Sequence, residues 1–289
     1  MADGEAMSSE DKIKVAAGFI MKAPPGEVKD VVKDARVLVA EDALFDARLP
    51  AILKEYNEQH LVVATGDGAK VVLCKAGAVE GGKYIDPAAM RLVTVDHATA
   101  SITASEELAE SQRDPKVEEV RAAAQEALGR YAAGALAGGC AAVHGTADAD
   151  GSITLSLAIS GVKLNSRNFW NGAWRSFWKV TVPPKGGKGE LSGTIVAMVH
   201  YFEDGNVRME AKRDHSAPLA ASDGAALAEA IADGVRAAEA QHQAWIEESY
   251  TTMSDTAFKN LRRKMPITQT KFQWGKVAAY SLASELKGK

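Results

Sequence analysis

The chain has 289 residues, of which 46% are hydrophobic and 25% charged, and its formal net charge is −4. These proportions are ordinary for a globular protein and allow one large domain or two smaller lobes. The sequence has no apolar run near the roughly eighteen residues that cross a bilayer, no disulfide framework and no signal-peptide pattern at its polar start. We therefore expect a cytoplasmic protein.

Residues 1–60 are expected to form an N-terminal helical region. Apolar side chains recur at helical spacing over residues 13–20, 28–38 and 44–56. Pro50 falls inside the third of these patterns and obscures where that helix begins.

Residues 61–215 are expected to form a central region that contains a helix and an antiparallel sheet. Two apolar runs flank Gly66-Asp67-Gly68 and predict a hairpin, and the Ala- and Glu-rich stretch 103–137 predicts a longer helix that ends at a glycine pair. Five strand patterns follow, joined by short polar turns, and short turns between successive strands are typical of antiparallel pairing.

The densest aromatic segment of the chain is residues 168–180. It holds three of the five tryptophans: Trp170, Trp174 and Trp178. On a strand these three would share one face, whereas Arg175 and Lys179 would point the other way. A stacking platform for nucleic acid would need basic flanking strands, which this acidic chain lacks, so we interpret the segment as a core strand packed against a long helix.

Residues 216–257 are expected to form a long helix with one apolar stripe, and residues 258–289 a basic, amphipathic tail. The tail carries eight Lys or Arg and one acid, so the other 257 residues carry about −11. Such polarity within one chain indicates that the tail meets an acidic partner. The candidate binding residues of the tail are Lys259, Arg262, Arg263, Lys264, Lys271, Trp274, Val277, Tyr280 and Leu282.

No catalytic pattern stands out in the sequence. The six histidines form no zinc-binding spacing, the glycine-rich stretch 186–189 lacks the spacing of a phosphate loop, and no serine sits in a nucleophile elbow. We expect no enzyme activity, no metal and no cofactor, although an enzyme whose groups meet only in the folded chain stays an alternative. A nucleic-acid binder is a further alternative, and its binding would survive deletion of the tail.

Four blocks of the sequence resemble the alpha subunit of F-actin-capping protein. In chain order they read KIKVAAGFIMKAPPGE, NFWNGAWRSFWKVTV, VHYFEDGNV and YTTMSDTAFKNLRRKMPITQTKFQWGKVAAYSL. The resemblance implies an α+β fold with N-terminal helices, a central antiparallel sheet, a long helix and a C-terminal extension. It also implies a heterodimer with a beta subunit of similar fold, in which the two sheets join into one.

The function implied by this resemblance is capping of the barbed end of actin filaments, which blocks addition and loss of subunits there. The family motif assigns actin contact to Lys259 and Arg263 in particular, and has an Arg where this chain has Gln269. The basic patch is also expected to bind phosphatidylinositol bisphosphate, and capping-protein regulators are expected as further partners. An alternative use of the same surface is capping of an actin-like filament in a larger assembly such as dynactin.

Overall fold

The fold begins with three helices that pack on one another. The computed structural model describes residues 7–109, 114–183, 189–219 and 224–258. The helices are α1 (Ser9–Met21), α2 (Val28–Val39) and α3 (Asp42–Gln59). Their apolar stripes meet in a small core that includes Ile20 and Phe45, as the helical spacing predicts. Pro50 lies within α3, where packing of Ile52 and Leu53 in the same core outweighs the local penalty of an interior proline.

Residues 63–107 form a small six-stranded sheet. Its strands are β1 (Val63–Gly66), β2 (Ala69–Val72), β3 (Ala78–Val79), β4 (Lys83–Asp86), β5 (Arg91–Asp96) and β6 (Ser101–Glu107). The predicted hairpin around Asp67-Gly68 is present as β1 and β2. The spatial order is β2-β1-β6-β5-β4-β3, and β1 pairs with β6 in parallel, so the prediction of a single antiparallel sheet was incomplete.

The helix predicted over 103–137 begins later than expected. Residues up to Glu107 pair with β5, and α4 runs from Pro115 to Ala135. Asp114 caps α4 by accepting a hydrogen bond from the backbone N–H of Lys116. Proline at the first helical position and an aspartate before it are strong start signals, and they fix this boundary locally.

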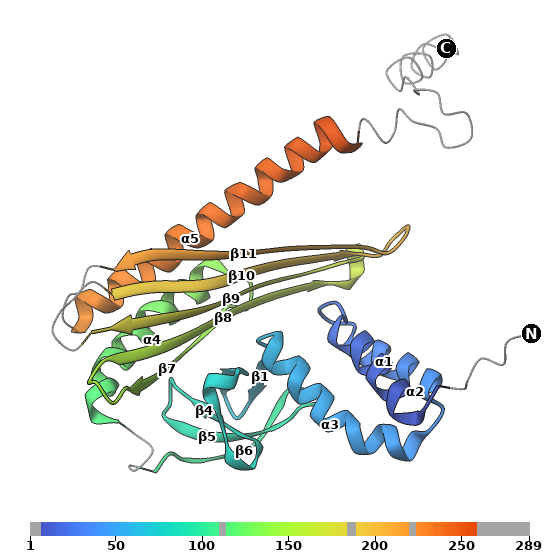
Figure 1. Cartoon of the computed structure of the whole chain (residues 1–289), viewed down its shortest axis with the longest axis horizontal. Coiled ribbons are helices and arrows are strands. Elements are labelled where there is room, and N and C mark those ends of the chain that lie inside the picture. Colours follow the sequence, from blue (N-terminus) through green and yellow to red (C-terminus); the bar gives the residue numbers. More distant parts are fainter. Residues whose placement is uncertain (1–6, 110–113, 184–188, 220–223, 259–289) are drawn as a thin grey trace, which may run out of the picture. The chain divides into compact units, whose positions relative to one another are not determined.

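Five long strands form the main sheet, shown side by side in Figure 1. They are β7 (Cys140–Ala147), β8 (Ile153–Asn165), β9 (Trp170–Val182), β10 (Gly189–Tyr201) and β11 (Val207–Leu219). Each pairs antiparallel with the next in sequence, which confirms the predicted meander. Strand β11 continues to Leu219, so the last long helix, α5 (Gly224–Thr252), starts several residues later than the predicted start at residue 216.

One face of the main sheet is covered by α4 and by residues 227–238 of α5. The buried side chains that meet there include Leu128, Leu157, Trp178, Ile195 and Ile231. Trp178 is fully buried, and Trp174 and Val180 share its face, as the alternation along β9 predicts. The chain divides into two units, Met1–Ala238 and Glu239–Lys289, and both sheets belong to the first.

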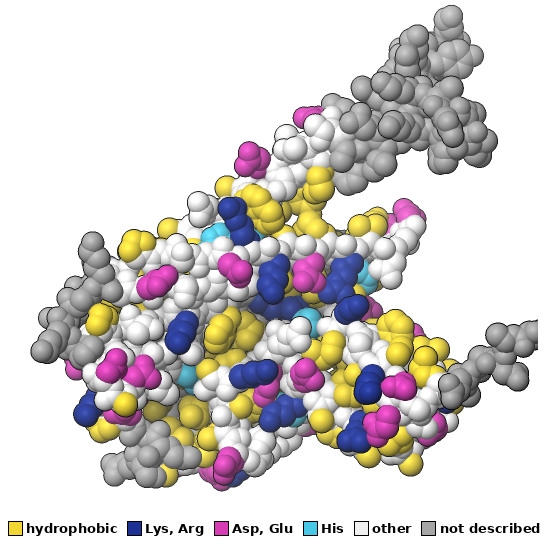
Figure 2. Space-filling model, viewed as in Figure 1, with side chains coloured by type: hydrophobic (Ala, Val, Ile, Leu, Met, Phe, Trp, Pro, Cys, Tyr) yellow, Lys and Arg dark blue, Asp and Glu magenta, His cyan; other side chains and the backbone are white. Residues whose placement is uncertain are grey.

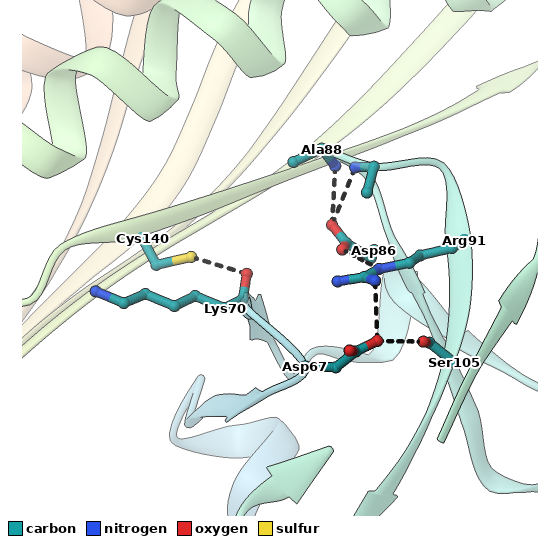
Figure 3. A network of polar contacts seen from close by, with 8 residues as sticks. Asp67, Lys70, Asp86, Ala88, Arg91, Ser105 and Cys140 are labelled. Atoms are coloured by element: carbon teal, nitrogen blue, oxygen red, sulfur yellow. Dashed lines mark hydrogen bonds and ion pairs between the residues drawn. The ribbon is translucent and has the colours of Figure 1, made fainter. Parts of the chain in front are cut away.

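The small sheet is attached to the edge of the main sheet near β7. The thiol of Cys140 donates to the carbonyl of Lys70 over 3.5 Å (Figure 3). Within the small sheet, Asp86 accepts from Arg91, which also reaches Asp67, and Ser105 donates to Asp67 over 2.6 Å. These contacts join three strand ends and a turn, so we interpret this polar network as structural.

Candidate functional site

The nine candidate residues of the tail lie outside the described residues. The described chain ends with a π-helical turn, Met253–Phe258, that follows α5 directly. The assignment of these residues to actin binding therefore stays a prediction. The described residues offer a different kind of site, which is the surface of the main sheet that the helices do not cover.

The first feature of this surface is a free strand edge. Strand β11 pairs with β10 over thirteen residues in continuous register, from Tyr201 opposite Val207 to Gly189 opposite Leu219. No other described strand pairs with its second edge. A long unpaired edge exposes backbone donors and acceptors that readily pair with a strand of another chain.

The register also shows which backbone groups face the free edge. Pro218 lies within β11 opposite Glu190, and a proline has no N–H to donate to β10. In an antiparallel pair the residues that bond to the neighbour alternate with those that do not. Because the register has no bulge, the even-numbered residues of β11, such as Lys212, direct their N–H and C=O groups away from β10.

Side chains of both signs alternate along β11 on the sheet face opposite the helices. They are Arg208, Glu210, Lys212 and Asp214. Arg208 contacts Glu210 at 2.9 Å, and Asp214 accepts from Thr194 of β10 at 2.5 Å. Figure 2 shows Lys, Arg, Asp and Glu interspersed across this view rather than gathered by sign. Mixed charge of this kind suits a specific protein partner better than a polyanion.

Apolar side chains are also exposed on the N-terminal helices. Val15 and Phe19 lie one turn apart on α1 and are about half exposed, and Val37 and Leu38 at the end of α2 are exposed still more. Helices that bury their other face in the core of α1–α3 leave these residues available to a partner.

Where the C-terminal end of α3 meets the main sheet, Arg175 of β9 contacts His60. The guanidinium donates to Nδ1 of His60, and His60 Nε2 lies 2.8 Å from the carbonyl oxygen of Met21. Since a carbonyl only accepts, Nε2 carries the proton and Nδ1 is the acceptor. The ring of His60 also stacks on Tyr56 with centroids 4.1 Å apart.

The electrostatics of this pair favour a neutral imidazole. Burial, followed by the positive charges of Arg175 and Arg208, lowers the pKa of His60 to about 4. Burial also lowers the pKa of the Arg175 guanidinium. An arginine stays protonated in proteins, so the pair is a buried positive charge held against a neutral ring.

Two cavities open beside Arg175. The first, of about 470 Å³, is lined by three acids, Glu55, Glu58 and Glu210, together with basic and apolar side chains. The second, of about 440 Å³, is bounded by the turn after α1, the end of α3, the turn 97–100 and strand β8. No Asp or Glu of the described residues lines the second one, which we call the acid-free cavity.

The described residues contain no cluster of three or more His, Cys, Asp or Glu side chains placed to hold a metal ion. None of the helices in the described part of the chain is long and apolar enough to span a membrane.

Comparison with known families identifies the family of the chain. The family model of the F-actin capping protein alpha subunit matches residues 16–285, which span both sheets, α5 and most of the tail. The chain belongs to this family. The resemblance seen in the sequence, and with it the α+β capping-protein fold, is confirmed.

Curated relatives agree over almost the whole chain. F-actin-capping protein subunit alpha of Dictyostelium discoideum is 31% identical, covering 96% of this chain and 99% of the relative. That of Emericella nidulans is 32% identical, covering 96% and 97%. A solved structure described as the homodimeric actin capping protein alpha subunit of Plasmodium berghei superposes with a TM-score of 0.70 at 20% identity, covering 80% of this chain and 90% of that one.

Sequence reasoning missed the partnership of His60 and Arg175. Alternation along β9 correctly placed Arg175 on the face opposite the tryptophans, but His60 was judged only as a histidine without a metal-binding pattern. The one signal in the sequence was an arginine on the strand face opposite the tryptophans whose next neighbour on that face is Phe177 and not an acid.

Proposed function

We propose that this chain is the alpha subunit of a heterodimer that caps the barbed ends of actin filaments in the cytoskeleton of the cytoplasm, without catalytic activity. The observation that carries the proposal is the family match over residues 16–285, which includes the basic tail as well as the sheet. Capping requires a surface that holds the filament end and a stable platform to present it. The tail and the main sheet are the candidates for these two roles.

The partner of the platform is a capping protein beta subunit, joined along strand β11. Three features support this pairing: the thirteen-residue free edge, the alternating charges along it, and the exposed apolar residues of α1 and α2. A strand of similar length on the partner would satisfy the outward backbone groups and extend the sheet. The beta subunit would also remove apolar surface from water.

The tail is proposed to bind actin in two steps. Its basic residues, Lys259, Arg262, Arg263, Lys264 and Lys271, steer the encounter with an acidic filament end and make association sensitive to salt. Its apolar residues, Trp274, Val277, Tyr280 and Leu282, then dock as an amphipathic helix in a groove and slow dissociation. The headgroup of phosphatidylinositol bisphosphate would compete for the same basic residues. Capping-protein regulators are further candidate partners.

The deciding test measures elongation of actin from barbed-end seeds, with the full chain co-expressed with a beta subunit. We expect inhibition at nanomolar concentration that collapses when the chain is truncated after Asn260. A Lys259→Glu/Arg263→Glu variant should weaken capping in the same direction, whereas Lys14→Glu, at an exposed lysine of α1, should not. Unchanged elongation in the presence of the intact complex would refute the proposal.

The mode of pairing has its own test. Lys212→Pro removes an outward N–H of β11 and should reduce association with the beta subunit, whereas Lys212→Ala removes the same charge and should leave association intact. Equal association of these two variants with the beta subunit would rule out the β11 edge as the interface.

Light scattering of the chain alone reports whether it self-associates, in the manner of the homodimeric alpha subunit of Plasmodium berghei.

Gln269 is proposed to weaken actin binding relative to family members with an arginine there. We expect faster dissociation from barbed ends or a steeper salt dependence, partly offset by Lys264. Gln269→Arg should slow dissociation, and an unchanged dissociation rate would count against this role.

A further inference from the structure

Arg175 is a buried cation without a counter-ion among the described residues. Its side chain donates to the neutral ring of His60, and no described carboxylate lies within ion-pair distance of it. The carboxylate that acts on it most, Glu210, is itself paired with Arg208 at 2.9 Å. A guanidinium has five N–H donors, so one bond to an imidazole leaves most of its donor capacity available.

A buried guanidinium without a counter-ion is energetically unfavourable unless a bound ligand supplies the opposite charge. Removing a charge from water carries a large desolvation penalty, which is normally offset by an opposite charge and further hydrogen bonds. Beside Arg175, the fully buried hydroxyl of Ser160, its register partner on β8, also has no hydrogen-bond partner among the described residues. Ser160 lines neither of the two cavities, so an anion in the acid-free cavity would meet the guanidinium of Arg175 and not this hydroxyl.

The acid-free cavity is the side of Arg175 on which an anion fits. The cavity on the other side presents three carboxylates, which would repel an anion. The acid-free cavity instead combines Arg175 with Lys29 from the start of α2. Its His97 accepts from Asn57 at Nδ1, over 3.1 Å, which leaves a protonated Nε2 as a further donor.

Apolar side chains make up much of the remaining wall of this cavity, beside the polar side chains of Asn57 and Thr99. Val28, Val62, Val63, Val162 and Leu164 line it together with Pro25. A volume of about 440 Å³ is within the range of small-molecule sites, which combine apolar walls with a few convergent polar groups. The occupant therefore carries both a compact oxyanion and an apolar part.

We propose that the acid-free cavity binds a small organic phosphate, whose phosphate group is held by the Arg175 guanidinium and whose apolar part contacts the valine and leucine walls. Arginine matches phosphate oxygens with two parallel hydrogen bonds, which gives both strength and orientation. The residues that line this cavity all lie between Pro25 and Arg175, and the site would add a ligand to the proposed capping function. Because the cavity adjoins α1–α3 and the main sheet, its ligand would tie these parts together.

The test is calorimetric titration of the full chain, purified with its beta subunit, with phenyl phosphate, inorganic phosphate and benzyl alcohol as probes. We expect phenyl phosphate to bind more tightly than inorganic phosphate, and benzyl alcohol not to bind measurably. Arg175→Met should weaken phenyl phosphate binding by about tenfold or more, because charge-assisted hydrogen bonds are lost. Lys179→Met changes a basic residue on the same face of the same strand and should leave binding unchanged.

A second pair of variants keeps Arg175 and changes the cavity wall. Val162 lies on β8 two residues from Ser160 and lines the cavity. Val162→Glu places a carboxylate in the wall of the cavity and should abolish phosphate binding. Val162→Gln introduces an uncharged side chain of the same size as glutamate and should retain phosphate binding. Absence of phenyl phosphate binding to the unmodified complex, or binding that survives both Arg175→Met and Val162→Glu, would overturn the proposal.

The phosphate can come from a soluble metabolite or from a lipid headgroup, and one further comparison separates them. Inositol trisphosphate in solution and vesicles of phosphatidylcholine with phosphatidylinositol bisphosphate are each titrated against the unmodified complex and Arg175→Met. An effect of Arg175→Met confined to vesicles would assign the site to a lipid, and an effect in solution to a soluble phosphate. If Arg175→Met has no effect in either format, the site does not take phosphates.

Discussion

The two faces of the main sheet are built from the same strands and differ in almost every physical property. The helix-covered face places Leu155, Trp178 and Leu191 in one fully buried core under α4 and α5. On the opposite face, Phe177 is about two-fifths exposed and Lys212 lies open along β11. Alternation along a strand thus separates the residues that stabilise the fold from those available to partners.

This difference shows where function can change without loss of the fold. Substitutions on the helix-covered face act through packing and should affect every property of the protein at once. Substitutions of exposed residues on the opposite face, such as Phe177 and Lys212, act through contacts with other molecules and should leave the free energy of unfolding nearly unchanged. Arg175 and Ser160 share that face but are buried, so they are not part of this set. Neighbouring residues of one strand therefore provide matched pairs for testing the comparison.

The largest expected effect is that of Trp178→Ala. The side chain is fully buried, and its removal should lower the free energy of unfolding by about 3–5 kcal/mol. Phe177 is the neighbouring residue and its side chain lies on the opposite face, so Phe177→Ala should lower the free energy of unfolding by less than about 1 kcal/mol. Urea unfolding at one fixed protein concentration measures both, since association with a partner also changes apparent stability. Equal losses would break the comparison of the two faces.

The second-largest expected effect is destabilisation by acid through two buried histidines, His60 and His144. Burial lowers the pKa of both His60 and His144 to about 4, while the unfolded chain takes up protons near 6.5. Stability is therefore fully present above pH 6.5 and is lost as the pH falls towards 4, by up to about 3 kcal/mol for each histidine. Urea unfolding at several pH values should show this slope, and His60→Gln and His144→Gln should each flatten it. An unchanged slope in both variants would assign acid sensitivity to other groups.

A smaller effect is expected from a single methyl group on the helix-covered face. A Cβ added at Gly193 would lie 2.5 Å from the carbonyl of Phe177 and 2.4 Å from the ring of Trp178. Gly193→Ala should cost about 1–3 kcal/mol through overpacking. Gly205→Ala, in the turn between β10 and β11 with no atom within 4 Å of the new methyl, should change stability by less than about 0.5 kcal/mol. Thermal unfolding distinguishes them, and equal melting temperatures would contradict the crowding at Gly193.

Much of the fold could be predicted from local patterns. The three N-terminal helices, the hairpin at Asp67-Gly68 and the meander after Cys140 follow from apolar periodicity and turn residues. Boundaries were less accurate where two signals competed. Residues 103–107 include three good helix formers, Ala104, Glu106 and Glu107, yet this segment pairs with β5, because sheet contacts outweigh weak local propensity.

The candidate sites divide in the same way. The sequence alone shows the charge polarity of the tail, the two-faced alternation along β9 and the motifs of the capping-protein family, since each of these depends on neighbouring residues. Only the tertiary structure brings His60 and Arg175 together across 115 residues and leaves one edge of β11 unpaired among the described strands. It also creates the acid-free cavity beside a buried arginine. These features depend on which elements pack together, and local periodicity carries no information about contacts between distant parts of the chain.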